Sequence, residues 1–107
     1  MDMKKPKILE KYVLKACLEY LAYRPGLWWR NSTGAMPVGD NRFIRFGFKG
    51  SADIIGLTAS GRFGAIECKG TGGVQSEQQK HFQEQVEFNM GIYVLAFDVD
   101  DIVRVGL

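Results

Sequence analysis

The sequence is poor in the side chains that build zinc sites and disulfide frameworks. It contains two cysteines and one histidine and has no Cys-x-x-Cys motif, which excludes a zinc site of ordinary composition. Cys17 and Cys68 stand far apart among apolar neighbours, a pattern typical of small core side chains. We therefore expect free thiols in a reducing, cytoplasmic compartment.

Long apolar runs are also absent. No stretch approaches the roughly 18 residues that a membrane-spanning helix needs, and no apolar signal-peptide core follows the first residues. With 107 residues, 46% of them hydrophobic, the chain can bury one core and is too short for a second. We expect a single domain over residues 1–107 that has no membrane contact.

Charge is distributed unevenly along a chain whose net charge is only +2. Residues 1–50 hold ten Lys/Arg and four Asp/Glu, whereas residues 51–107 hold four and eight. A basic region favours contact with a polyanion, and an acidic region can collect carboxylates around a cation. The distribution indicates a nucleic-acid partner and a separate acidic site.

The first half of the chain predicts one helix followed by extended segments. Apolar residues recur at three- and four-residue spacing over 4–23, which indicates an amphipathic helix that ends at the turn 24–26. The aromatic stretch 27–32 predicts a strand, and the Gly- and Pro-containing stretch 33–41 predicts a loop. Residues 42–51 alternate cationic and aromatic side chains, which fits an extended segment or a mobile loop.

The second half predicts a hairpin, a helix, a buried strand and a short closing helix. In order these are strands 52–58 and 63–69, a helix over 76–90, a strand over 92–98 and a helix over 99–107. Ser76 and Gln79 form a capping box, Gly91 is expected to close the helix, and Asp98 or Asp100 caps the last helix. The element order predicts an α/β fold with a mixed sheet flanked by helices.

Two carboxylates are expected to face each other across the predicted hairpin. Residues i and i+2 of a strand share a face, so Glu67 and Lys69 project together, opposite Ile66 and Cys68. If the hairpin is symmetric about Ser60, Asp53 lies opposite Glu67, with Cβ atoms about 4.5–5.5 Å apart. Opposed carboxylates repel each other unless a cation lies between them.

Mg²⁺ or Mn²⁺ fits this pair best, because hard divalent ions prefer oxygen ligands and the sequence offers no thiolate or imidazole cluster. Lys69 on the same face could then orient a nucleophilic water or offset charge on a phosphate. Asp53, Glu67 and Lys69 thus suit phosphodiester hydrolysis. The alternative is an ordinary cross-strand salt bridge in a small structural domain.

The stretch "GSADIIGLTASGRFGAIECKGTGGVQSEQQKHF" resembles the active-site region of the VRR-NUC domain, a branch of the PD-(D/E)XK nuclease superfamily. The matching positions are Gly50, Asp53, Ile54, Gly56, Glu67, Cys68, Lys69, Ser76 and Gln79, with Trp29, Arg30, Asn31, Gly34 and a first-helix glutamate upstream. Two departures are Ser51-Ala52 in place of the superfamily's proline and Leu14, where the family often has Gln four residues after the glutamate.

The resemblance implies a restriction-endonuclease-like αβββαβ core and metal-dependent DNA cleavage. It implies that Asp53 and Glu67 ligate the metal, that the Cys68 backbone carbonyl adds a ligand, and that Glu10 completes the shell. Lys69 would position or activate the attacking water, assisted by Gln79. Glu19 is an alternative to Glu10, although Glu10 shares a helical stripe with apolar residues.

Cationic residues outside the hairpin are candidates for nucleic-acid binding. Arg42, Arg45 and Lys49 can neutralise phosphates while the interleaved phenylalanines stack or pack, and Arg30 matches the family's Trp-x-Asn region. In the alternative interpretation, Phe43, Phe46 and Phe48 are core residues and the cations are merely solvated. Trp28 and Trp29 are more typical of core or interface positions, and His81 of a solvated surface.

Short stand-alone viral and bacterial relatives in the VRR-NUC family form homodimers that act on four-way junctions, whereas larger relatives with added domains act on flaps. No added domain is expected here, so we expect a homodimer that resolves branched DNA in a microbial or phage-infected cell. Trp28, Trp29 or the segment 43–48 could supply the interface. The rival interpretations are a flap-type nuclease and a catalytically weak nucleic-acid-binding protein of the same fold.

Overall fold

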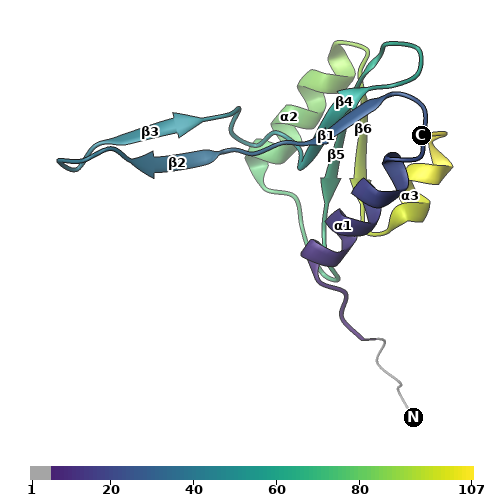
Figure 1. Cartoon of the computed structure of the whole chain (residues 1–107), viewed down its shortest axis with the longest axis horizontal. Helices are drawn as coiled ribbons and strands as arrows, with labels where there is room; N and C mark the ends of the chain where they lie inside the picture. Colours follow the sequence, from purple (N-terminus) through teal and green to yellow (C-terminus); the bar gives the residue numbers. More distant parts are fainter. Residues whose placement is uncertain (1–5) are drawn as a thin grey trace.

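A mixed four-stranded sheet forms the centre of the protein, whose computed structural model describes residues 6–107. Its strand order is β1-β4-β5-β6, where β1 is Leu27–Arg30, β4 is Ile54–Leu57, β5 is Phe63–Cys68 and β6 is Ile92–Ala96. The first three strands are mutually antiparallel, and β6 runs parallel to β5. The predicted α/β class and mixed sheet are therefore confirmed (Figure 1).

Helices cover both faces of this sheet. Helices α1 (Glu10–Leu21) and α3 (Val99–Arg104) pack over one face, and α2 (Glu77–Phe88) packs over the other. Alternate residues of β5 divide between the two sides: Ile66 and Cys68 join the α1 and α3 core, and Ala65 joins the α2 core. The period of two that was predicted for this strand is thus present, and it directs Glu67 toward α2.

Helix α1 begins at Glu10 and not near residue 4 as the apolar spacing predicts. Residues 4 and 5 lie outside the described part of the chain, and 6–9 are not helical. Ile8 is instead bound to Thr71: the Ile8 N–H donates to Oγ1 (2.9 Å), and the Thr71 N–H donates to the Ile8 carbonyl (2.9 Å). This long-range tie holds the segment extended, so periodicity alone could not locate the helix start.

Helix α2 has the predicted N-terminus and a different C-terminus. Ser76 Oγ accepts from the Gln79 N–H (3.1 Å), and Gln79 Oε1 accepts from the Ser76 N–H (2.8 Å), which confirms the capping box. At the other end Met90, not Gly91, has the positive φ of 67°. In α3, Asp98 is the N-cap of the two candidates, since its Oδ1 accepts from the Asp101 N–H (3.1 Å).

The register of the β4–β5 hairpin is the symmetric one. Ile54 pairs with Ile66, and Leu57 pairs with Phe63 at the turn end. One step beyond Ile54 and Ile66, the next opposed positions are Asp53 and Glu67. The expectation that these carboxylates face each other follows directly from this register, and both predicted free cysteines, Cys17 and Cys68, are buried and free.

Strands β2 (Gly34–Pro37) and β3 (Phe43–Phe46) form a separate two-stranded sheet, the arm, which extends away from the body (Figure 1). The predicted loop over 33–41 is therefore wrong where β2 lies. The core interpretation of the phenylalanines is also wrong, because Phe43, Phe46 and Phe48 are 68%, 44% and 62% exposed. Among residues 6–107, no helix is long and apolar enough to cross a membrane.

Candidate metal centre

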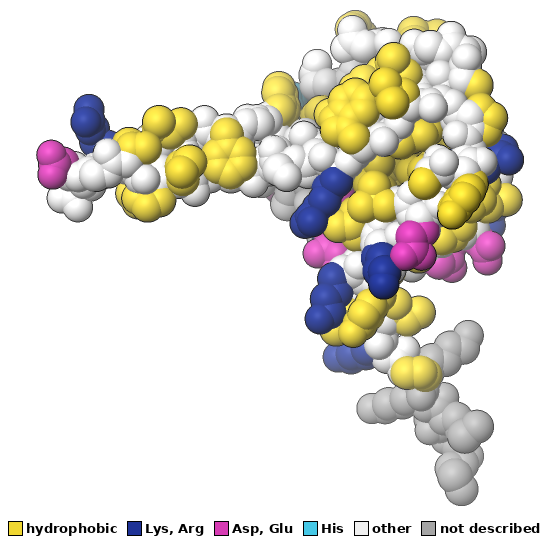
Figure 2. All heavy atoms as spheres, in the orientation of Figure 1, with side chains coloured by type: hydrophobic (Ala, Val, Ile, Leu, Met, Phe, Trp, Pro, Cys, Tyr) yellow, Lys and Arg dark blue, Asp and Glu magenta, His cyan; other side chains and the backbone are white. Residues whose placement is uncertain are grey.

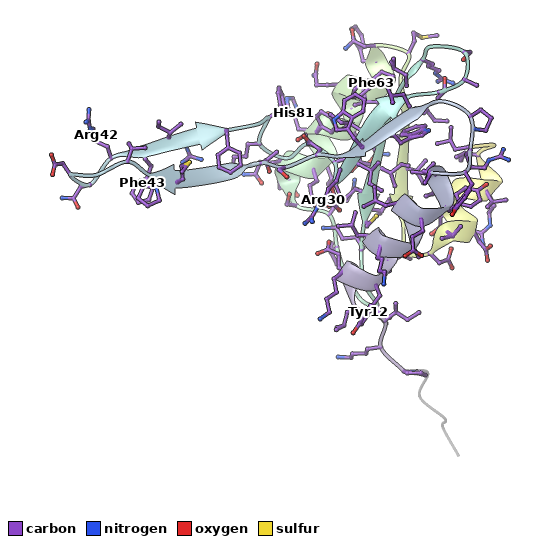
Figure 3. The ribbon with its side chains drawn as sticks, in the orientation of Figure 1. Tyr12, Arg30, Arg42, Phe43, Phe63 and His81 are labelled. Carbon is purple, nitrogen blue, oxygen red and sulfur yellow. The ribbon has the colours of Figure 1, made fainter. Side chains whose placement is uncertain are left out.

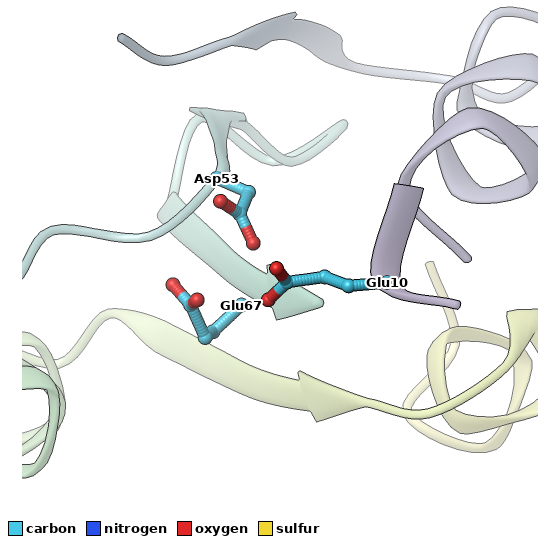
Figure 4. Close-up of side chains that lie close together, drawn as sticks. All are labelled: Glu10, Asp53 and Glu67. Atoms are coloured by element: carbon cyan, nitrogen blue, oxygen red, sulfur yellow. The ribbon is translucent and has the colours of Figure 1, made fainter. Parts of the chain in front are cut away.

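Three carboxylates from three separate elements converge at one end of the hairpin. Glu10 begins α1, Asp53 directly precedes β4, and Glu67 lies in β5. One carboxylate oxygen from each residue lies within 4.8 Å of the other two (Figure 4). Glu19, the alternative to Glu10, is exposed and lies 4.0 Å from Lys15, so the structure brings Glu10 and not Glu19 to the cluster.

Backbone contacts around Gly70 hold Glu10 beside the end of β5. A Cβ on Gly70 would lie 2.6 Å from the Ile8 carbonyl oxygen and 2.7 Å from the Glu10 nitrogen. The tie between Ile8 and Thr71 therefore requires glycine at this position. Sequence reasoning missed both Gly70 and Thr71, although a glycine directly after a Glu-x-Lys strand end is a signal of close backbone approach.

Glu67 is the buried member of the cluster, with 2% of its surface exposed. Its Oε1 accepts from Gln79 Nε2 (3.0 Å) and lies 3.7 Å from Lys69 Nζ. Burial, followed by the charge and contact of Asp53, raises the pKa of Glu67 to about 8, against the opposing effect of Lys69. Its other oxygen, Oε2, is buried without a hydrogen-bond partner among residues 6–107.

Gln79 joins the helix cap to the cluster through both ends of its amide. Its Oε1 accepts from Lys69 Nζ (2.9 Å) as well as from the Ser76 N–H, while its Nε2 donates to Glu67. These partners satisfy the polar atoms of an amide that is not fully exposed. The capping box thus fixes the side chain that aligns Lys69 with Glu67.

Asp53 and Cys68 meet through the backbone at the end of the hairpin. Asp53 Oδ2 accepts from the Cys68 N–H (2.9 Å), and the Asp53 carbonyl accepts from the Asn31 N–H (2.7 Å). The Cys68 side chain points into the core on the opposite face, where contact with Cys17, and then burial, raise the pKa of its thiol. The thiol is therefore no ligand, and ligation by the Cys68 carbonyl stays a prediction.

The cluster has the composition of a site for a hard cation. Three carboxylates outnumber the single ammonium of Lys69, and the buried Oε2 of Glu67 lacks a donor in the described chain. A divalent ion would satisfy that oxygen and offset the burial and the repulsion by Asp53 that together raise the pKa of Glu67. The three carboxylates could thus hold a metal ion. The observation that supports this is the buried Oε2 of Glu67, which has no hydrogen-bond partner in the described chain.

A cleft of about 360 Å³ adjoins the cluster and opens between the N-terminal segment and the loop after β5. Glu10 and Lys69 line it together with Lys7, Thr71 and Val74. Lys7 lies in the non-helical segment that precedes α1. The cleft lining thus contains two cations, Lys7 and Lys69, together with the carboxylate of Glu10.

The predicted nucleic-acid-binding residues lie outside this cleft. Arg30 is exposed on β1, next to α1, and Arg42 lies near the far end of the arm (Figure 3). Arg45 and Lys49 line one hollow at the base of the arm. His81 is exposed on α2, as expected. The structure thus unites the catalytic candidates, whereas the basic candidates spread over a wider surface.

No family model matches the chain, and neither a curated protein nor a solved structure matches it. The resemblance to the VRR-NUC domain therefore rests on the residues of this sequence.

Proposed function

We propose that the protein is a metal-dependent endonuclease that hydrolyses phosphodiester bonds of branched DNA, with the PD-(D/E)XK core of a VRR-NUC domain. One observation carries the proposal: Gln79 bonds both Lys69 and Glu67, beside the carboxylates of Asp53 and Glu10. A salt bridge between Lys69 and Glu67 needs neither a third carboxylate nor an orphaned oxygen. A metal site uses both, because each free carboxylate oxygen is a ligand for a hard cation.

Asp53, Glu67 and Glu10 would hold Mg²⁺ or Mn²⁺, with the Cys68 carbonyl as a further ligand. When bound, the ion polarises the phosphate and lowers the pKa of a bound water. The chain's own contribution is to keep three carboxylates within reach of one another before the ion arrives. Burial of Glu67 and the Cys68 N–H bond to Asp53 fix two of them.

Lys69 is the catalytic residue of this proposal. Its side chain is only 12% exposed and its ammonium is oriented by Gln79 at 2.9 Å. From there it faces the cleft, where it orients the attacking water and stabilises charge that develops on the phosphate. Gln79 is a positioning residue, because it acts through Lys69 and Glu67.

The DNA would lie over the cleft and the basic residues around it. Lys7 contributes a cation at the cleft itself, and Arg30, Arg42, Arg45 and Lys49 contact phosphates farther along the duplex arms. One chain supplies one cluster and cuts one strand. A two-fold homodimer would present two clusters, which matches the pseudo-symmetry of a four-way junction and permits paired nicks.

The test is cleavage of a labelled four-way junction, with a linear duplex of the same sequence alongside, in Mg²⁺ or Mn²⁺. We expect metal-dependent cuts in the junction and loss of cutting in Asp53→Asn and Glu67→Gln, with DNA binding retained. Glu10→Gln should cut slowly, while its matched control on the same helix, Glu19→Gln, should cut like the wild type. Cutting by Glu67→Gln at the wild-type rate would overturn the site assignment, and binding without metal-dependent cutting would favour a nucleic-acid-binding protein.

A further inference from the structure

Neither face of the arm is buried by the described part of its own chain. All residues of β2 and β3 are exposed, and within residues 6–107 the substantial contacts of these strands are with each other. A two-stranded hairpin on its own is marginally stable in water. The arm is therefore an element that lacks a surface to pack against.

One face of the arm is apolar from its base as far as Val38, which lies opposite Arg42 near the tip. Residues opposite each other in an antiparallel pair share a face, so the pairs Met36–Ile44 and Gly34–Phe46 lie on the same side, followed by Val38. We call Met36, Val38, Ile44 and Phe46 the arm's apolar face. Their exposures are 52%, 41%, 54% and 44%. Figure 2 shows hydrophobic side chains along the arm, and such a continuous patch is characteristic of a protein interface.

The body carries an apolar groove that could receive this face. The groove, of about 300 Å³, is lined by Phe48, Phe63, Phe82, Gln85, Val86, Asn89 and Gly91. Phe48 and Phe82 pack at 5.6 Å between ring centroids and form one wall. Because the groove begins at the base of the arm while the arm extends away from the body (Figure 1), a chain does not fill its own groove.

Charge favours a protein occupant that resembles this chain. Over 34–46 the arm carries Arg42 and Arg45 against Asp40, and over 77–88 helix α2 carries three glutamates against Lys80. A basic arm and an acidic helix beside the groove attract each other. Nucleic acid would be repelled by α2 and offers phosphates, not an apolar wall, to the arm's apolar face.

We propose that the arm of one copy packs its apolar face into the groove of a second copy, and that the second arm does the same in return. A reciprocal contact of this kind has two-fold symmetry, because each of the two copies contributes one arm and one groove. The inference names the interface of the proposed homodimer and requires no metal at the acidic cluster. Arg42, opposite Val38, lies on the face that meets the groove, whereas Arg45 lies on the other face and stays available to DNA. Trp28 is not needed, because it packs against the core.

Cross-linking tests the contact directly. The native thiols Cys17 and Cys68 are 0% exposed, so an added pair, Ile44→Cys with Phe63→Cys, supplies the only accessible thiols. Mild oxidation should convert the double variant into a covalent species of twice the 12.0 kDa chain mass. Each single variant should stay uncross-linked. Failure of the double variant to cross-link, or cross-linking of Ile44→Cys alone, would overturn the arm-in-groove contact.

Light scattering on protein without the added cysteines provides the second measurement. The wild type should be dimeric at tens of micromolar, and Met36→Ser/Ile44→Ser should halve the mass without altering the circular dichroism spectrum. Tyr23→Ser/Val74→Ser, which removes residues 89% and 77% exposed outside the arm, should stay dimeric. A monomeric wild type, or an arm variant that is still dimeric, would overturn the proposal. Glu67→Gln should stay dimeric, so loss of cleavage and loss of the dimer are separable.

Discussion

The hairpin β4–β5 and the arm β2–β3 are both antiparallel pairs of short strands, yet their surroundings differ completely. Every residue of β5 after Phe63 is buried, whereas all residues of β2 and β3 are exposed. The first pair is enclosed by its own helices and can hold a carboxylate at 2% exposure. The second carries apolar residues that nothing in the described part of its own chain covers. We therefore expect the chemistry at the enclosed pair and the contacts with partners at the open one.

Lys69→Ala should sharpen this assignment most, because it removes the cation that directly follows β5 and lies 3.7 Å from Glu67. We expect the single-turnover cleavage rate to fall by about 10²–10³-fold, with metal affinity nearly intact. Lys69→Arg should restore little, since a planar fork cannot replace a compact ammonium between Gln79 and Glu67. Calorimetry that showed no metal binding by folded Lys69→Ala would contradict this division of roles.

The pH dependence of stability should also belong to the enclosed pair. The folded-state pKa of Glu67, about 8, lies above its ordinary value of 4.5, so the folded protein binds the proton more tightly. The stabilising contribution is complete below pH 4.5 and is lost as the pH rises through 8. In metal-free buffer, Tm should fall by at least about 5 °C between pH 5 and 8.5, and Glu67→Gln should flatten the curve. An equally steep fall in Glu67→Gln would assign the effect to another group.

Gln79→Ala should have a smaller, double effect, because this side chain serves the capping box and the cluster together. We expect a loss of about 1–2 kcal/mol in the free energy of unfolding and a roughly tenfold slower cleavage rate. The neighbouring exposed residue offers a matched control: Gln78→Ala should leave both quantities unchanged. Equal losses in the two variants would show that the hydrogen bonds of the Gln79 side chain are not the cause, because alanine itself favours the helix.

Removing charge from the open pair should change binding and not chemistry. In Arg42→Ala/Arg45→Ala/Lys49→Ala, the slope of log affinity against log salt concentration should flatten by roughly 0.9 for each phosphate that the variant no longer neutralises. The cleavage rate of bound substrate should stay within about twofold of the wild type, because these cations lie outside the cleft. An unchanged slope would place the DNA on another surface.

The sequence predicted the enclosed pair well because its determinants are local. Alternating faces, a symmetric turn about Ser60 and the Ser76–Gln79 cap each depend on residues close in the chain, and the structure has all three. The start of α1 and the approach of Glu10 depend on the bonds between Ile8 and Thr71, which are 63 positions apart. No periodic pattern encodes such a tie.

The arm was harder to predict for a different reason. Residues 34–37 contain Gly and Pro and do not alternate between apolar and polar side chains, since neither face is buried by the chain itself. A strand that its own chain does not bury on either face lacks the alternation of apolar and polar residues that burial of one face imposes. Exposed phenylalanines in β3 look identical to core phenylalanines in the sequence.

Titration with Mn²⁺ at pH 8, followed by electron paramagnetic resonance, tests most directly whether the acidic cluster is a metal centre. The wild type should bind Mn²⁺ at one site per chain, Glu67→Gln should lose that site, and Glu10→Gln should bind more weakly. Glu19→Gln should bind like the wild type, because Glu19 lies outside the cluster. Wild-type protein that bound no Mn²⁺, or bound it equally well in Glu67→Gln, would contradict the account.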